Sequence, residues 1–170
     1  NMVDSIPAYN DYAHKALMPA MDQKQLAEVQ KLEAGHRTGD PRYMQILTTM
    51  HYEKHVLRMP SAQWPEPVTR SFGHINEQIY TLMQGPSELG ASGRLLNWDR
   101  SGDLHRIIVP TLVIGAQYDT MDPKYMAGMA NKLPHGQFML CQQGSHLAMY
   151  DDQQVYFDGL IGFLHGVERR

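Results

Sequence analysis

The sequence has little cysteine, no cluster of basic residues and no long apolar stretch. Its single cysteine, Cys141, excludes an internal disulfide framework and favours a reducing compartment, so we expect a cytoplasmic protein. The net charge of −3, without any run of Lys or Arg, argues against nucleic acid as a partner. No segment approaches the ~18 apolar residues of a membrane span, and the first residues lack a signal-peptide profile, so we expect no membrane partner.

The composition that remains is that of a globular protein. Of the 170 residues, 42% are hydrophobic and 19% are charged, which is too apolar for a disordered chain. A chain of this length can bury about two thirds of its unfolded surface, so it needs neither a disulfide nor a metal ion for stability. The opening text "NMVDSIPAYN" contains no strand and no Gly-rich turn, and we expect it to come from the middle of something longer.

The first part of the chain, residues 1–103, shows helical periodicity and loops without a strand pattern. Asp22 is a suitable N-cap for the helix that follows it, and Gly35 is suited to end that helix. Asp40 and Pro41 open a second helix, with proline at its first position. Helices are predicted over residues 23–34, 41–57 and 66–83, and a long loop rich in Gly, Ser and Asp over residues 84–103.

The pattern changes after Asp103. Short runs of β-branched and aliphatic residues alternate with helical segments, as in a parallel α/β unit whose strands are buried on both faces. Strands are predicted over residues 112–115 and 137–141, and helices over residues 121–133 and 151–168. Two strands cannot form an independent sheet that is covered on both faces. The α/β part therefore requires more sheet than this sequence supplies.

A polar residue suited to acid–base catalysis follows each predicted strand. Asp119 follows the first strand and His146 the second, so parallel strands place both at the carboxyl edge of the sheet. A carboxylate on one imidazole nitrogen holds a histidine in one tautomer and stabilises the imidazolium. In α/β-hydrolases the acid precedes the histidine, and the serine lies upstream of both. Taken together the two residues indicate the acid and base of a hydrolase triad, although each alone fits an ordinary loop residue.

No matching nucleophile is found in the sequence. The serine of an α/β-hydrolase lies in a G-x-S-x-G turn between a strand and a helix. The nearest text here is "GPSELG", in which Ser87 follows no strand. Cys141 lies within an apolar strand, which favours a buried and inert thiol. We therefore expect the nucleophile to lie outside this sequence.

The whole chain resembles the C-terminal portion of proline iminopeptidase (prolyl aminopeptidase), an α/β-hydrolase family with a helical cap inserted before its last core strands. The matching text is "SIPAYNDYA", "WPEPVTRSF", "YTLMQGPSELGASGRLLNWDRSGDLHRIIVPTLVIGAQYDTMDP" and "GSHLAMYDD". The resemblance implies an incomplete α/β-hydrolase. Residues 1–103 would form the helical cap, and residues 104–170 the C-terminal part of the core with its last two parallel strands and helices.

The same resemblance implies roles for particular residues. Asp119 would be the triad acid and His146 the triad base. Glu88, in "GPSE", would be a carboxylate that binds the free N-terminal amine of the substrate, and Tyr80 would line the same site. Better-known members of the family carry a second glutamate directly after the triad acid, where this chain has Thr120. One anionic anchor is therefore lost, which leaves room for amide or ester hydrolysis.

These implications predict a serine hydrolase that releases an N-terminal residue, preferably proline, from small peptides or amides with a free N-terminus. It would use neither a cofactor nor a metal. This chain would supply the acid and the histidine, and a separate N-terminal half of the core, as a partner, would supply the serine. The alternative is an inactive truncated fragment that acts as a binding or self-associating module. Either way, exposed sheet edges and helix faces favour a homo-oligomer.

Two further patterns have simpler explanations. His51 and His55, in "HYEKH", could share a helix face and bind zinc, but Glu53 does not directly follow the first histidine as in the metalloprotease motif. We expect these histidines on a helix surface. Trp98 and Asp99 are expected to seat the cap on the core, with a substrate contact as the alternative.

Overall fold

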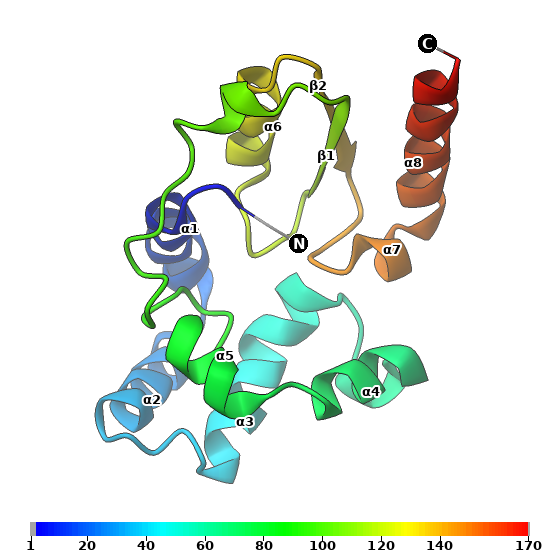
Figure 1. Cartoon of the computed structure of the whole chain (residues 1–170). Coiled ribbons are helices and arrows are strands. Elements are labelled where there is room, and N and C mark those ends of the chain that lie inside the picture. The colour runs from blue at the N-terminus through cyan, green and yellow to red at the C-terminus, as the bar shows by residue number, and fades with distance from the viewer. Residues whose placement is uncertain (1–2, 170) are drawn as a thin grey trace.

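The structure is a computed structural model that describes residues 3–169. A helical region (residues 3–103) lies beside an α/β region (residues 104–169) that contains a two-stranded sheet (Figure 1). The α-helices of the helical region are α1 (Ile6–Tyr12), α2 (Gln23–Ala34), α3 (Pro41–Leu47), α4 (Glu66–Gly73) and α5 (Glu77–Met83). The α/β region comprises β1 (Thr111–Ala116), α6 (Pro123–Lys132), β2 (Gly136–Cys141), α7 (Ala148–Asp151) and α8 (Gln153–Glu168). Within residues 3–169, none of the helices combines the length and apolarity needed to cross a bilayer.

Aspartate side chains begin the helices where the sequence predicts them. The Asp22 carboxylate accepts hydrogen bonds from the backbone N–H groups of Lys24 and Gln25, at 3.0 and 2.9 Å, and α2 has the predicted bounds. Asp40 and Asp122 cap α3 and α6 in the same way. These caps satisfy N–H groups that have no partner inside the helix, so they fix each helix start locally.

One of the predicted helices is interrupted, and another begins two residues later than predicted. The single helix predicted over residues 66–83 is wrong, because α4 ends at Gly73 and Asn76 caps a separate α5 by accepting from the N–H of Ile79 at 3.1 Å. At Asn76, a short polar side chain offers the backbone a competing hydrogen bond, which favours a new helix start over continuation. The closing helix predicted over residues 151–168 is α8, which begins at Gln153 and ends at Glu168 as predicted, and the short α7 precedes it.

The helix predicted over residues 41–57 is continuous but changes its winding. It is an α-helix to Leu47 and a π-helix over Thr48–Val56. A wider helical turn rotates the following side chains relative to an α-helix, and π-helical turns are frequent at functional sites. This π-helix ends beside the loops that follow the two strands, as described below.

The helical region has its own buried core. Val29 and Leu47 are completely buried in it. The cluster consists of Leu17, Met21, Leu26, Val29, Leu32, Tyr43, Leu47, Met50, Tyr52, Val56 and Leu89. A second cluster joins the two regions, since it includes Ile6 and Tyr9 of α1 together with Val113 of β1 and Met126 of α6. The two regions therefore pack against each other through apolar side chains.

The two strands are parallel and in register from Thr111↔Gly136 to Ala116↔Cys141. Helix α6 lies on one side of the strands and α8 on the other (Figure 1). Helix α8 approaches the sheet closely at Gly159, where an added Cβ would lie 1.8 Å from the Sδ of Met139. The order strand–helix–strand–helix agrees with the predicted parallel α/β unit.

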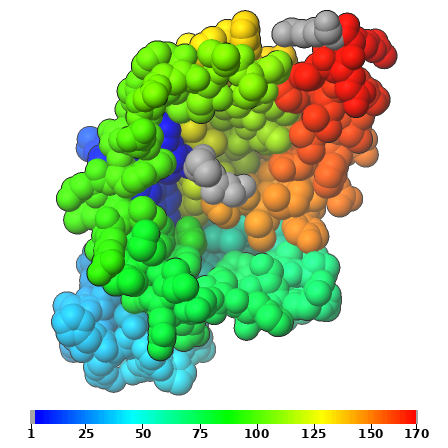
Figure 2. Space-filling model, in the orientation of Figure 1, coloured from blue at the N-terminus to red at the C-terminus, as the bar shows by residue number. Residues whose placement is uncertain are grey.

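The α/β region leaves much apolar surface uncovered. Among the described residues, no strand pairs with the edge of β1 that faces away from β2. Ile108 and Val109, which lead into β1, are 73% and 60% exposed. Helix α8 contains no buried residue and forms an outer flank of the molecule (Figure 2). The sequence predicted that two strands are too few for this region, and the exposed apolar side chains agree with that prediction.

Candidate active site

Asp119 and His146 meet at the carboxyl edge of the sheet. Asp119 lies in the loop after β1 and His146 in the loop after β2, and the two loops are joined by a hydrogen bond from the N–H of Tyr118 to the carbonyl of Gly144 at 3.0 Å. The Nδ1 of His146 lies 2.8 Å from the Oδ1 of Asp119. The structure therefore brings the predicted acid and base into direct contact.

The Asp119 carboxylate is buried and firmly oriented. Its Oδ1 accepts hydrogen bonds from the backbone N–H of Met121 at 3.1 Å and from the hydroxyl of Thr120 at 3.2 Å. The same Thr120 oxygen lies 3.3 Å from Nδ1 of His146. Because Nδ1 faces a carboxylate, this nitrogen carries a proton and Nε2 is the basic nitrogen of the ring. The arrangement suits a histidine that accepts and returns a proton at Nε2.

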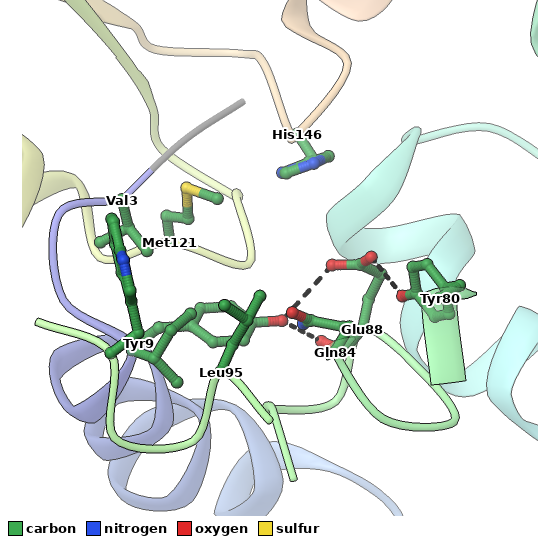
Figure 3. A pocket seen from close by; sticks show the side chains of 10 residues that line it. Val3, Tyr9, Tyr80, Gln84, Glu88, Leu95, Met121 and His146 are labelled. Atoms are coloured by element: carbon green, nitrogen blue, oxygen red, sulfur yellow. Dashed lines mark hydrogen bonds between the residues drawn. The ribbon is translucent and has the colours of Figure 1, made fainter. Parts of the chain in front are cut away.

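Glu88 lies among tyrosine hydroxyl groups. Tyr80 donates a hydrogen bond to its Oε1 at 2.5 Å. Tyr9 donates to the Glu88 carbonyl at 2.6 Å and lies 3.5 Å from Oε2 (Figure 3). Burial, together with the charge of Glu88, raises the pKa of both tyrosines, so both remain hydrogen-bond donors at neutral pH. The carboxylate is thereby held in one orientation.

A cavity of about 310 Å³ brings three of the predicted residues together. His146 lies at one side, and Glu88 with Tyr80 at another (Figure 3). The lining is Val3, Ile6, Tyr9, Tyr80, Gln84, Glu88, Leu95, Trp98, Met121 and His146. Asp119 does not line this cavity, and it contacts His146 at Nδ1 of the ring. A small molecule in the cavity would meet a basic nitrogen, a carboxylate and an otherwise largely apolar wall.

Two of the residues that line the cavity, Tyr9 and Trp98, were not among the predicted site residues. Tyr9 was missed because it lies on α1, 79 positions before Glu88, and no local pattern links the two. Trp98 was expected to connect the two parts of the chain. Trp98 lines this cavity and also a second cavity, of about 460 Å³, that lies along β1. Its carbonyl accepts a hydrogen bond from the N–H of Ile6 at 2.9 Å. Both the expected packing role and the alternative substrate contact remain compatible with this position.

The other candidate nucleophiles are inaccessible. Ser87 is buried, and its hydroxyl accepts a hydrogen bond from the N–H of Leu89 at 3.2 Å, as in a turn. Cys141 is completely buried at the end of β2, and burial raises the pKa of its thiol to about 11. A thiol with such a pKa is protonated at neutral pH and is a poor nucleophile. Neither side chain lines the cavity that contains His146.

The expectation that His51 and His55 lie on a helix surface is wrong for His51. Its side chain is completely buried, and burial lowers its pKa to about 3. The Nε2–H of His51 donates to the Glu88 carbonyl, with 3.2 Å between nitrogen and oxygen. His55 is half-buried, and its Nδ1–H donates to the carbonyl of Tyr118 at 2.9 Å. Within residues 3–169, no group of three potential ligands could hold a metal ion.

Similarity to known proteins identifies the family of this chain. A scan against protein-family models found no match. The proline iminopeptidase of Flavobacterium johnsoniae is 46% identical over 98% of this chain and 56% of the relative's length. That of Elizabethkingia meningoseptica is 45% identical over the whole chain and 57% of the relative, and that of Chitinophaga pinensis 42% identical over 98% and 56%. The chain belongs to the proline iminopeptidase family. It corresponds to a C-terminal portion of these proteins and spans a little over half of their length.

Solved structures confirm the fold. The crystal structure of VinJ matches 96% of this chain with a TM-score of 0.88 at 22% identity, and the match covers 55% of that protein. The crystal structure of proline iminopeptidase from Mycobacterium smegmatis matches 96% of the chain with a TM-score of 0.79, also at 22% identity, and 54% of that protein is covered. The predicted fold, an incomplete α/β-hydrolase, is therefore confirmed.

Proposed function

We propose that this chain is the part of a proline iminopeptidase-like serine hydrolase that provides the acid, the base and the amine anchor. The serine would come from the remaining portion of the protein. The observation that supports the proposal most strongly is the 2.8 Å contact between Asp119 and His146, beside a cavity that also holds Glu88. The family relationship supports it independently.

The proposed reaction uses His146 as a proton carrier. Nε2 of His146 takes the hydroxyl proton of the serine as its oxygen attacks the carbonyl carbon of the N-terminal residue. The same nitrogen then gives this proton to the leaving amine, and a water molecule hydrolyses the acyl-enzyme by the same steps. Asp119 keeps the ring oriented and stabilises the imidazolium. The three hydrogen-bond partners of the Asp119 Oδ1, which are Met121 N–H, the Thr120 hydroxyl and His146 Nδ1, support this role.

We propose that Glu88 binds the amino terminus of the substrate. A carboxylate offers about four acceptor sites, of which the hydroxyl of Tyr80 occupies one on Oε1 and that of Tyr9 one on Oε2, so that about two remain. A secondary ammonium, as in an N-terminal proline, has two N–H groups, which one carboxylate can satisfy. A primary ammonium has three, and much of the remaining wall is apolar, including Leu95 and Met121. An unsatisfied buried donor lowers affinity, which favours proline.

Thr120 does not contribute a second anchor in this proposal. Its side chain is completely buried, with the hydroxyl between Asp119 and His146, and it does not line the cavity. A single carboxylate therefore carries the recognition of the amine. We expect the affinity for free N-termini to depend more strongly on Glu88 than in relatives with two glutamates.

The open edge of β1 supports the idea that the remaining portion docks there. A cavity of about 460 Å³ lies along β1 and is lined by Thr111, Leu112, Val113 and Ile114. The carboxylate of Asp4, also on this cavity, is buried, and Lys132 Nζ lies 4.0 Å away. An added parallel strand would satisfy the backbone groups of the edge and cover the apolar side chains along it.

The proposal is tested by complementation. The purified chain is assayed on proline p-nitroanilide alone and together with the N-terminal portion of the Flavobacterium johnsoniae relative. We expect no turnover from the chain alone. In the mixture we expect turnover that a serine-directed organophosphate abolishes and that Asp119→Asn lowers by about 10⁴-fold. Turnover by the chain alone that survives the organophosphate would refute the proposed mechanism.

A second set of substrates tests the amine anchor. Glu88→Gln keeps the size of the side chain and removes its charge. In the complemented enzyme we expect this variant to raise KM for proline p-nitroanilide and to leave the hydrolysis of an N-acetylated proline ester nearly unchanged. An equal loss on both substrates would show that Glu88 does not bind the amine.

The alternative function, a self-associating module, is favoured by the apolar side chains exposed on α8 and near β1. Sedimentation of the purified chain distinguishes it. A stable oligomer that is unaffected by the N-terminal portion, with no turnover in the mixture, would favour this alternative. A chain that leaves its oligomer to form a one-to-one active complex would favour the hydrolase.

A further inference from the structure

The end of the π-helix Thr48–Val56 contacts the loop that carries the proposed base. The carbonyl of His55 accepts a hydrogen bond from the N–H of His146 at 3.0 Å. The next carbonyl, of Val56, accepts from the N–H of Leu147 at 2.9 Å and from the hydroxyl of Ser145 at 3.0 Å. The last carbonyls of a helix have no partner within it. Here the loop that carries His146 provides those partners, so the backbone of this loop is fixed to the end of the π-helix.

The same helix end contacts the loop that carries the proposed acid. The Nδ1–H of His55 donates to the carbonyl of Tyr118 at 2.9 Å, directly before Asp119. The guanidinium carbon of Arg58 lies 3.6 Å from the centre of the Tyr118 ring, and its Nη1 donates to the carbonyl of Gln143 at 2.7 Å. His55 therefore bonds with its side chain to the acid loop and with its carbonyl to His146 itself.

We infer that His55 is a positioning residue that sets the distance between Asp119 and His146, an inference that rests on the proposed function. The strands and the bond from Tyr118 to Gly144 join the two loops at their bases. His55 acts farther out, at the residue before the acid and at the base. A misplacement of about 1 Å can cost about 100-fold in rate, so an added constraint at this point has a large effect.

The chemistry of this donor suits its position. Burial lowers the pKa of His55, so the ring is neutral at pH 7, and Nδ1 carries the proton because it faces a carbonyl. A neutral donor holds the acid loop without placing a second cation beside Asp119. A permanently charged donor would compete with the imidazolium of His146 for that carboxylate. Asparagine would also be a neutral donor and can place an amide N–H near the position of Nδ1.

The test uses the chain itself. Nuclear magnetic resonance of the His146 ring reports whether its Nδ1 proton is bonded to Asp119 and protected from exchange with water. We expect this proton to be protected in the wild-type chain and in His55→Asn, and to exchange at least tenfold faster in His55→Leu. Lys54→Ala, an exposed neighbour on the same helix, serves as the control and should leave the proton unchanged. Equal protection in His55→Leu and the wild type would overturn the inference.

Further readouts separate this inference from the proposed function. In the complemented enzyme, His55→Leu should lower kcat about 10- to 100-fold with KM within twofold, and His55→Asn should recover most of kcat. If His55→Leu does not fold, His55→Asn decides alone, since loss of the protected proton in that folded variant contradicts the inference. If the proton responds as expected but no mixture turns over substrate, the positioning role stands and the proposed function fails.

Discussion

The helical region and the α/β region differ in how far each covers its own apolar residues. In the helical region, Val29 and Leu47 are completely buried in a cluster drawn almost entirely from its helices. In the α/β region, α8 has no buried residue, and Ile161 and Leu164 are each 48% exposed. Both regions have regular secondary structure. Regular strands and helices therefore do not by themselves make a complete core.

The difference agrees with the length of the relatives. The chain spans 56% of the Flavobacterium johnsoniae protein. Although the α/β region is the shorter of the two, it contains more of the exposed large hydrophobic residues than the helical region. Because the helical region is packed from residues close in sequence, it completes its core within this chain. The sheet has two strands among the described residues, and one edge of β1 has no partner strand there. Four substitution experiments test this contrast.

The largest effect is expected from a matched pair of leucines. Leu47→Ala removes a completely buried side chain and should lower the free energy of unfolding by about 2–5 kcal/mol. Leu164→Ala, on the exposed face of α8, should change it by less than about 0.5 kcal/mol. Urea unfolding of both variants measures the difference. Similar losses would mean that α8 is already packed in solution, and the contrast between the regions would be wrong.

Acid should destabilise the helical region through His51. In the unfolded chain this histidine titrates near its usual value, whereas burial lowers the pKa in the folded chain to about 3. The unfolded state therefore binds more protons between these values, and stability falls as the pH decreases, by at most about 1.4 kcal/mol per pH unit. His51→Gln can keep a donor to the Glu88 carbonyl and should remove this part of the dependence. Urea unfolding between pH 7 and pH 4 measures the slopes, and equal slopes in the two proteins would contradict the assignment.

Helix caps should contribute equally in both regions. Asp22→Ala on α2 and Asp122→Ala on α6 each remove an acceptor of backbone N–H groups, and each should cost about 1 kcal/mol. Asparagine at either position should retain most of the stability. Thermal unfolding of the four variants measures this. A cap in the α/β region that contributes nothing would show that α6 is not formed stably without the rest of the sheet.

The smallest effect is expected from two glycines of α8. An added Cβ at Gly162 meets nothing within 4 Å, so Gly162→Ala should stabilise the helix by about 0.5–1 kcal/mol. At Gly159 the same atom would lie 1.8 Å from Met139 Sδ, so Gly159→Ala should destabilise the contact with β2. Opposite changes in melting temperature are the expected result. A gain at both positions would mean that α8 does not pack on the sheet.

Much of the local structure was predictable from the sequence. Aspartates before Pro41 and Pro123, and the alternation of strands and helices after Asp103, gave helix starts and strands within one or two residues. These signals act over three or four residues, so a local reading detects them. The break at Asn76 was missed because the apolar spacing continues across it, although asparagine is itself a good N-cap.

The site was predictable only where it follows strand ends or a family motif. Asp119 and His146 lie in the loops that follow the two strands, so the parallel arrangement predicts that they lie at the same edge of the sheet. Tyr9 and His51, which both bond to the carbonyl of Glu88, carry no such signal. Their positions depend on how α1 and the π-helix pack against the loop of Glu88, and contacts between residues 79 and 37 positions apart are invisible to local patterns.

The buried thiol at the end of β2 reports how often this end of the sheet opens. Cys141 packs with Ala116 and Ala148, and no other cysteine competes with it for reagent. A thiol-specific alkylating agent can therefore label Cys141 only when the end of the sheet opens. The rate of labelling measures how often that opening occurs. Docking of a further strand on β1 should lower the labelling rate. The size of the decrease would measure how much the added strand stabilises the sheet against opening.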